Sequence, residues 1–153
     1  MDKNIGLQNN KSSTSFLDKK PVLYGMIVLC IILMFASYMQ HKKRKQLQEA
    51  AALPFYGVSV EDVYDGSYVG ETFTSFMHVQ LEVTVENHKI TNIRVLENEG
   101  SRGQKVEPIL DRIIAQNKSV VPAEKGEEIA SLVFISCIDD ALRKGLQNEN
   151  TMQ

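Results

Sequence analysis

The stretch VQLEVTVENHKITNIRVLENEG, residues 79–100, decides the fold of this chain. Its first half alternates between polar and apolar residues, which is typical of a strand with one buried and one solvated face. The apolar positions are Val79, Leu81, Val83 and Val85. Asn87 and His88 form a turn signal, and residues 90–96 return as the second strand. The stretch therefore predicts a β-hairpin.

A further short strand is expected around Tyr68, after the turn signal Asp65-Gly66. Downstream of the hairpin the period changes from two to 3.6 residues, and one apolar stripe predicts an amphipathic helix. The stripe consists of Val106, Ile109, Leu110, Ile113 and Ile114. Because proline is tolerated only in the first turn of a helix, Pro108 indicates a start near Glu107.

A last helix is expected over residues 127–146, after a loop at residues 119–126. Strands followed by helices indicate an α+β fold, in which helices pack on one face of a small antiparallel sheet. We therefore expect one folded domain over residues 58–146 and a frayed tail over residues 147–153.

An uncharged segment precedes the domain: residues 22–39 read VLYGMIVLCIILMFASYM. Eighteen residues in a helix span roughly 27 Å, close to the thickness of a bilayer core. A cleavable signal peptide would have a shorter apolar stretch. We expect an uncleaved transmembrane helix over residues 21–40, after a disordered polar tail (1–20) and before a basic juxtamembrane segment and linker (41–57).

Charge is divided unevenly along the chain. Residues 1–45 hold eight Lys/Arg against two Asp/Glu, and residues 46–153 hold nine against 17. An acidic body argues against a nucleic-acid-binding domain. The flanks of the apolar segment carry three basic residues before it and four after it, which slightly favours a cytoplasmic carboxyl side in a single-pass cell-membrane protein.

No signature of a self-contained enzyme or of a metal site is expected. Cys30 lies in the apolar segment, far from Cys137, and the three histidines (41, 78 and 88) have no ligand spacing. No nucleophile elbow precedes Ser136. Asp139 and Asp140 are adjacent and do not face each other on a helix, so a solvated face is expected rather than an acid/base pair.

Residues 65–71, Asp-Gly-Ser-Tyr-Val-Gly-Glu, resemble the D-G-x-Y-x-G-E opening of the FMN-binding domain family. The hairpin is similar to that family's next signature, and the closing I-x-x-A-L-x-x-G-L at residues 138–146 lies in the expected order. The likeness covers about residues 63–146. Members include flavin-carrying domains anchored beside Rnf-type and sodium-pumping NADH:quinone oxidoreductase complexes.

The resemblance implies a membrane-anchored, flavin-based electron-transfer component with FMN as its cofactor. It implies a membrane redox complex or another electron-transfer protein as partner, and a domain on the extracytoplasmic side, opposite to the side that the flanking charges favour.

The chain departs from the family at the cofactor signature S-G-A-T-x-[ST], in which FMN is joined through phosphate to threonine in many members. Alignment of the closing helices without a gap brings Leu132 to the acceptor position. Leucine has no hydroxyl, so only Ser131 and Ser136 lie near enough to substitute. Glu127 and Glu128 would also repel a phosphate at the start of this helix, and nearby lysines offset only part of that repulsion. Any FMN is therefore expected to be non-covalent.

Other residues leave two interpretations open. Arg102 and Lys105 could contact an anionic ligand or belong to a solvated loop. Four aromatic residues could stack on a flavin or pack in the sheet: Tyr64, Tyr68, Phe73 and Phe76. The alternative class of function is a flavin-less interaction, scaffold or small-ligand-sensing domain that keeps the fold.

Overall fold

The computed structural model describes residues 20–100 and 105–147. The chain forms two compact units, residues 1–41 and residues 42–153, which are described separately. The tails expected at residues 1–20 and 147–153 lie almost entirely outside the described residues, and so does Arg102.

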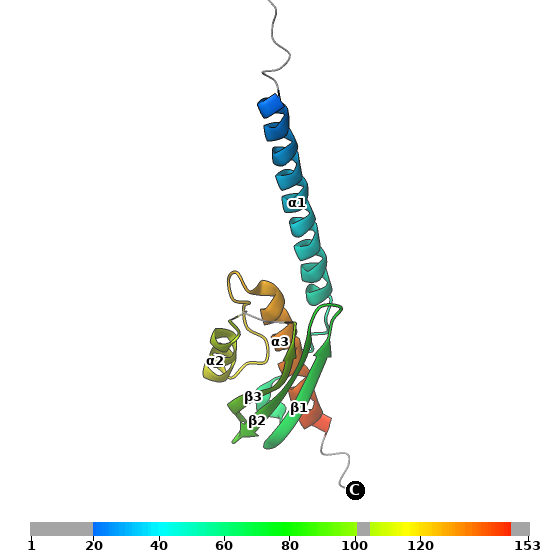
Figure 1. The fold of residues 1–153 in the computed structure, drawn as a ribbon. Coiled ribbons are helices and arrows are strands. Elements are labelled where there is room, and N and C mark those ends of the chain that lie inside the picture. The colour runs from blue at the N-terminus through cyan, green and yellow to red at the C-terminus, as the bar shows by residue number, and fades with distance from the viewer. Residues whose placement is uncertain (1–19, 101–104, 148–153) are drawn as a thin grey trace, which may run out of the picture. The chain divides into compact units, whose positions relative to one another are not determined.

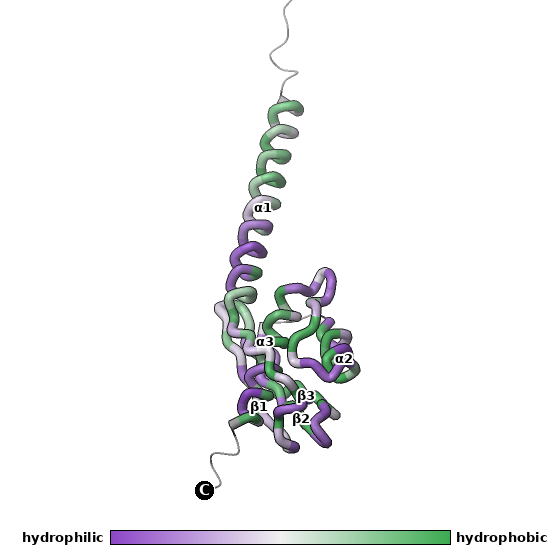
Figure 2. Tube along the Cα trace, turned by 180° about the vertical axis from the view of Figure 1, so that it is seen from behind, coloured by the Kyte–Doolittle hydropathy of each residue, from purple (hydrophilic) through white to green (hydrophobic). Residues whose placement is uncertain are grey.

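Helix α1 (Lys20–Ala51) begins in the first unit and ends in the second. Its apolar part has a mean hydropathy of 2.3, with none of that window buried, so it is long and apolar enough to cross a membrane. Figure 2 shows the change from hydrophobic to hydrophilic residues along this helix. The expectation of one helix able to span a membrane is confirmed, although a signal sequence has the same properties.

The second unit is built around a three-stranded antiparallel sheet of order β1-β2-β3. The strands are β1 (Gly66–Phe73), β2 (His78–Glu86) and β3 (Lys89–Glu99). Asn87 and His88 form the tight turn between β2 and β3, with φ values of 52° and 58°, as the twist of a two-residue hairpin turn requires. The predicted hairpin is confirmed.

One face of the sheet is covered and the other is open (Figure 1). The four alternating apolar residues of β2 are completely buried. Helix α3 (Glu128–Gln147) packs on β1 and β2, and helix α2 (Glu107–Gln116) contacts β3. A short 3₁₀ helix, η2 (Val60–Asp62), precedes β1. The expected α+β class, with helices on an antiparallel sheet after an apolar helix, is confirmed.

A glycine allows a close contact between the sheet and α3. A Cβ atom at Gly70 of β1 would lie 2.0 Å from the carbonyl oxygen of Cys137 on α3. At Gly145 it would lie 2.5 Å from a methyl group of Val63. The two backbones therefore approach closely at Gly70 because that residue has no side chain.

The residues that connect α1 to the sheet pack into the second unit. Ala50 is completely buried, and Leu53 and Phe55 pack against the core. The carboxylate of Glu49 accepts hydrogen bonds from the backbone N–H and the hydroxyl of Ser75, in the turn between β1 and β2. Residues 49–55, inside the segment expected to be a linker, thus contribute to the folded unit.

Candidate functional site

The three residues aligned with the attachment signature, Ser131, Leu132 and Ser136, lie in the first half of α3. Ser131 is buried, and its hydroxyl oxygen accepts the backbone N–H of Glu124 at 3.0 Å. The hydroxyl of Ser136 is also buried and donates to the carbonyl oxygen of Pro54 at 3.1 Å. Leu132 is half-buried and packs against the core. Each hydroxyl is therefore hydrogen-bonded to the backbone of a neighbouring segment, at Glu124 for Ser131 and at Pro54 for Ser136.

Ser131 and Ser136 also point in different directions. Five residues along an α-helix correspond to a rotation of about 140° about its axis. Ser136 lines a small hollow of about 180 Å³ together with Asp140, and Ser131 is not among the residues that line it. The structure thus does not bring these two serines together in one site.

The amino end of α3 holds an internal anion. The carboxylate of Glu128 accepts the backbone N–H of Gly126 at 2.9 Å. This hydrogen bond, a second one from its own N–H, and the charges of Lys125 and Lys43 lower the pKa of Glu128. A helix amino terminus attracts anions through its free N–H groups. Here a carboxylate of the chain itself occupies part of that position.

The prediction of a solvated face for the aspartate pair is wrong for Asp139. Its side chain is completely buried and accepts three backbone hydrogen bonds. The donors are the N–H groups of Tyr56, of Gly57 at 3.1 Å and of Val58 at 3.0 Å. A buried carboxylate is stable only with such partners, so Asp139 is a structural anchor for the segment before η2.

A signal for this burial was present in the sequence. Asp139 follows Ile135 by four residues and precedes Leu142 by three, and both are buried core residues. Residues at these spacings share one helix face. The position within the apolar stripe predicts burial better than the adjacency of the two aspartates.

Asp140 belongs to a surface network. Its carboxylate forms ion pairs with Arg143 and Lys144, both at 2.9 Å. Partial burial raises the pKa of Asp140, but hydrogen bonds from Lys144 and Arg143 outweigh it and lower the pKa overall. Lys144 also donates to the carbonyl oxygen of Val69 at 2.8 Å, on strand β1. Asp140 and Lys144 therefore connect α3 to the sheet, and their role is structural.

Cys137 lacks the properties of a nucleophile. It is buried, and its thiol donates to the carbonyl oxygen of Val79 at 3.4 Å. Burial raises the pKa of Cys137 to about 12. Because the thiolate is the reactive form, this cysteine is a packing residue at neutral pH.

The aromatic candidates divide between packing and surface. Tyr68 is buried, and its hydroxyl donates to the carbonyl oxygen of Tyr64 at 2.8 Å, while Phe76 packs against the core. Phe73 is 63% exposed and stacks on the ring of His78, with centroids 4.0 Å apart. Tyr64 is also exposed. The four residues therefore do not form one aromatic surface.

The residues that carry the D-G-x-Y-x-G-E pattern have structural roles. The carboxylate of Asp65 accepts the N–H of Asn87 at 2.8 Å and that of His88 at 3.1 Å, and these bonds lower the pKa of Asp65. Tyr68 fills the core, and Gly70 allows the contact with α3. In this chain the pattern describes how the hairpin and α3 are joined to β1.

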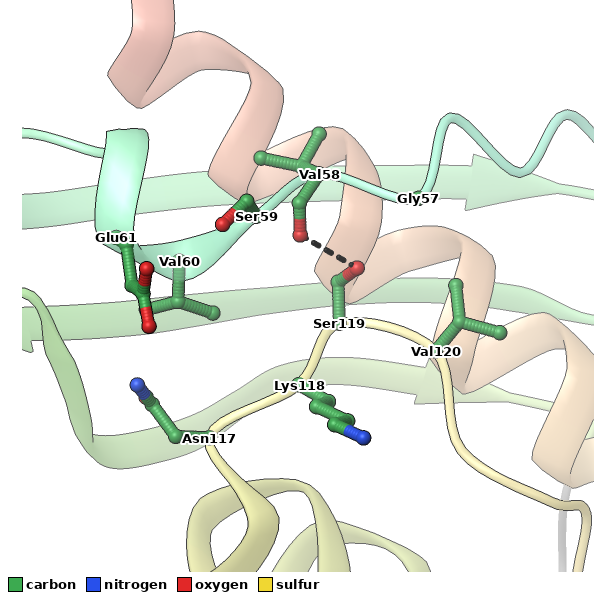
Figure 3. Close-up of a pocket in the computed structure, with 9 residues that line it drawn as sticks. All are labelled: Gly57, Val58, Ser59, Val60, Glu61, Asn117, Lys118, Ser119 and Val120. Carbon is green, nitrogen blue, oxygen red and sulfur yellow. Dashed lines mark hydrogen bonds between the residues drawn. The ribbon is translucent and has the colours of Figure 1, made fainter.

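Two further hollows lie at other places on the second unit. One, of about 300 Å³, lies beside the amino end of α3 and is lined by Gly126, Glu127 and Glu128 together with Lys43. The other, of about 310 Å³, lies between residues 57–61 and residues 117–120 (Figure 3). Sequence reasoning missed the second hollow, because its two walls are about 60 positions apart in the chain.

Among residues 20–100 and 105–147 no group of three or more His, Cys, Asp or Glu side chains could hold a metal ion. Lys105 is exposed, just before α2. No known family model, no curated protein and no solved structure matches this chain.

Proposed function

We propose that the chain is a membrane-anchored binding module that carries no flavin and acts through non-covalent contacts of its folded unit. The observation that carries the proposal is the use of the hydroxyls on α3. Ser131 and Ser136 are both buried and hydrogen-bonded to backbone, and Leu132 offers no oxygen. A phosphoester at either serine would require that hydroxyl to leave its backbone partner and reach solvent.

The electrostatics of the same region support the proposal. The carboxylate of Glu128 already accepts the N–H of Gly126 at the amino end of α3, and Glu127 lines the same hollow. The two carboxylates at this helix end would repel a dianionic phosphate, and Lys43 and Lys125 would offset part of that repulsion.

Membrane anchoring is the second part of the proposal. The apolar part of α1 is exposed on all sides, which is costly in water and favourable in lipid. A basic run follows it directly at residues 41–45, and basic residues at that position hold a helix at the headgroups.

Electron transfer by a flavin is the second candidate function. The ordered series of sequence motifs from residue 65 to residue 146 favours it, because the series resembles that of flavin-carrying domains. FMN would then be held without a covalent bond, and the partner would be a membrane redox complex or another electron-transfer protein.

Absorbance spectroscopy on the full chain separates the two candidates. The chain is co-expressed with a flavin transferase, purified in detergent, supplied with FMN and passed through a desalting column. The proposal predicts no absorbance near the flavin band at ~450 nm, a wavelength set by the cofactor's own chemistry.

Acid precipitation of the same sample identifies the kind of binding. Flavin that remains with the precipitated protein would overturn the proposal. Flavin released into the supernatant would favour the second candidate, a non-covalent flavoprotein. If flavin stays with the precipitate, the variants Ser131→Ala and Ser136→Ala show which hydroxyl carried it.

A further inference from the structure

We infer that Lys42, Arg44 and Lys45 form a binding surface for anionic phospholipids, whose phosphate groups contact these side chains where α1 leaves the bilayer. The inference rests on the membrane anchoring in the proposed function, because it names the lipid class that the anchor selects. It is carried by the positions of these residues on α1, by their exposure, and by the lack of an ion-pair partner among the described residues.

The basic run follows the apolar part of α1 at the depth of lipid headgroups. Residues 21–40 carry no charge, and residues 42–45 follow in the same unbroken helix, which ends at Ala51. At 1.5 Å per residue, these four residues lie about 3–8 Å past Gln40 along the helix axis. The headgroup layer on each side of a bilayer core is roughly 5–8 Å thick. The change from hydrophobic to hydrophilic residues in Figure 2 marks the same boundary.

The four basic residues of this run point to different sides of the helix. Successive residues of an α-helix are rotated by about 100°, so four in a row surround it. Lys43 shares a helix face with Gln46 and Ala50, three and seven residues further on. Ala50 is completely buried in the folded unit, and Lys43 and Gln46 line the hollow at the amino end of α3. Lys43 therefore faces the folded unit, and the other three lie on the remaining sides of the helix.

These three outward cations have no partner in the chain that would neutralise them. Lys42, Arg44 and Lys45 are exposed, and none of them forms an ion pair with another residue of the ranges 20–100 and 105–147. Lys43 differs from them. Backbone hydrogen bonds lower the pKa of Glu128, and the positive charge of Lys43 contributes to the same shift. A carboxylate of the folded unit thus offsets part of the charge of Lys43, whereas the other three charges are left for an external anion.

The rest of the chain after this run would not attract an anionic surface. Residues 46–153 hold nine Lys/Arg against 17 Asp/Glu, a net charge of −8. Each Lys or Arg close to a bilayer strengthens the attraction to anionic lipid by about fivefold. Positive charge concentrated at headgroup depth, beside an acidic domain, therefore favours anionic phospholipid as the occupant of this surface.

The test is electron spin resonance of spin-labelled lipids with the full chain reconstituted in phosphatidylcholine vesicles. Spin-labelled phosphatidylglycerol and phosphatidylcholine each report an association constant at the protein. We expect a ratio of about two or more in favour of phosphatidylglycerol, since the effect at each cation is averaged over all lipids around the helix. The ratio should fall toward one as NaCl rises from about 0.1 M to about 1 M, because the Debye length shortens from about 10 Å to about 3 Å.

Two triple variants separate the position of the charges from the net charge. The first replaces the three outward cations: Lys42→Gln, Arg44→Gln and Lys45→Gln. Its control removes three exposed lysines elsewhere in the second unit: Lys89→Gln, Lys105→Gln and Lys118→Gln. The first variant should lose at least about half of the preference for phosphatidylglycerol, and the basic residues before the apolar segment account for any remainder. The control should keep the ratio of the parent chain.

A pair of single variants tests the assignment to the outward sides. Arg44→Gln should lower the ratio more than Lys43→Gln does, because Lys43 faces the carboxylates at the amino end of α3. An equal or larger effect of Lys43→Gln would overturn the assignment.

Three results would overturn the inference as a whole: a ratio of one for the parent chain, equal ratios for the two triple variants, or a stronger loss in sodium phosphate than in NaCl of equal ionic strength. The last result would indicate a site for free phosphate instead of lipid. A carbonate wash of the vesicles separates this inference from the proposed function. A chain that stays in the washed vesicles and shows a ratio of one overturns this inference alone, whereas a chain that the wash releases overturns the membrane anchoring as well.

Discussion

Two regions of the second unit differ in how far they follow the pattern that the sequence resemblance to FMN-binding domains predicts. In residues 65–71 the matching residues join β1 to the hairpin and to α3, through Asp65, Tyr68 and Gly70. In residues 124–136 the signature is missing, and Ser131 and Ser136 hold backbone atoms. In this chain the residues of the first region join elements of the fold, and the hydroxyls of the second region are occupied by backbone partners.

The first region gives the largest expected effect. Gly70→Ala would bring a Cβ atom to 2.0 Å from the carbonyl oxygen of Cys137, so β1 and α3 must separate. We expect a loss of more than ~4 kcal/mol in the free energy of unfolding, or failure to fold. Denaturant unfolding of the full chain in micelles measures it. Gly25→Ala, where a Cβ atom meets nothing within 4 Å, is the control, and equal stability of both variants would contradict the packing of α3 on β1.

Asp139→Ala tests the contact that the sequence interpretation missed. Removal of the carboxylate leaves three buried or partly buried N–H groups without their acceptor. We expect a loss of about 3 kcal/mol, since an unsatisfied buried group costs roughly 1–3 kcal/mol. Asp111→Ala on the exposed side of α2 should change stability by less than ~0.5 kcal/mol. If the two variants unfold at the same denaturant concentration, the structural role of Asp139 is wrong.

Ser131→Ala sharpens the comparison in the second region. This hydroxyl accepts the Glu124 N–H, so its loss should lower the free energy of unfolding by about 1 kcal/mol. The flavin content should stay at zero in both the parent and the variant. If the parent chain binds flavin and Ser131→Ala loses it without losing stability, the hydroxyl of Ser131 holds a cofactor and not the backbone.

The smallest expected effect concerns pH. Hydrogen bonds from the N–H groups of His88 and Asn87 lower the pKa of Asp65 below its ordinary value of 3.8. The corresponding stability is present above that value and is lost as the pH falls through the lower folded-state pKa. The midpoint temperature of thermal unfolding should therefore decrease as the pH is lowered below about 4. Asp65→Asn should make this decrease less steep, and Asp111→Asn should leave it unchanged. Parallel curves for the parent and Asp65→Asn would exclude this contribution.

The sequence predicted the elements whose signal is local. Alternation in residues 79–85 identified the hairpin, and Pro108 with its apolar stripe identified the start of α2 near Glu107. The predicted last helix differs from α3 by one residue at each end. Each of these patterns lies within a dozen residues, where the period of side chains determines burial.

Contacts between distant residues were not predictable in the same way. The groove at residues 57–61 and 117–120 forms because Asp139 and Ser119 both bind one backbone segment, and no local pattern contains that information. Gly70 is part of the D-G-x-Y-x-G-E pattern. The sequence alone does not show whether such a glycine allows close packing of a helix, as Gly70 does with α3, or close approach of a phosphate.

The central claim is that the chain carries no covalent flavin. Intact-mass spectrometry of the full chain, after co-expression with a flavin transferase, tests it most directly. We expect the mass of the polypeptide alone. A mass increased by one FMN less one water, assigned by subsequent peptide mapping to Ser131 or Ser136, would contradict it.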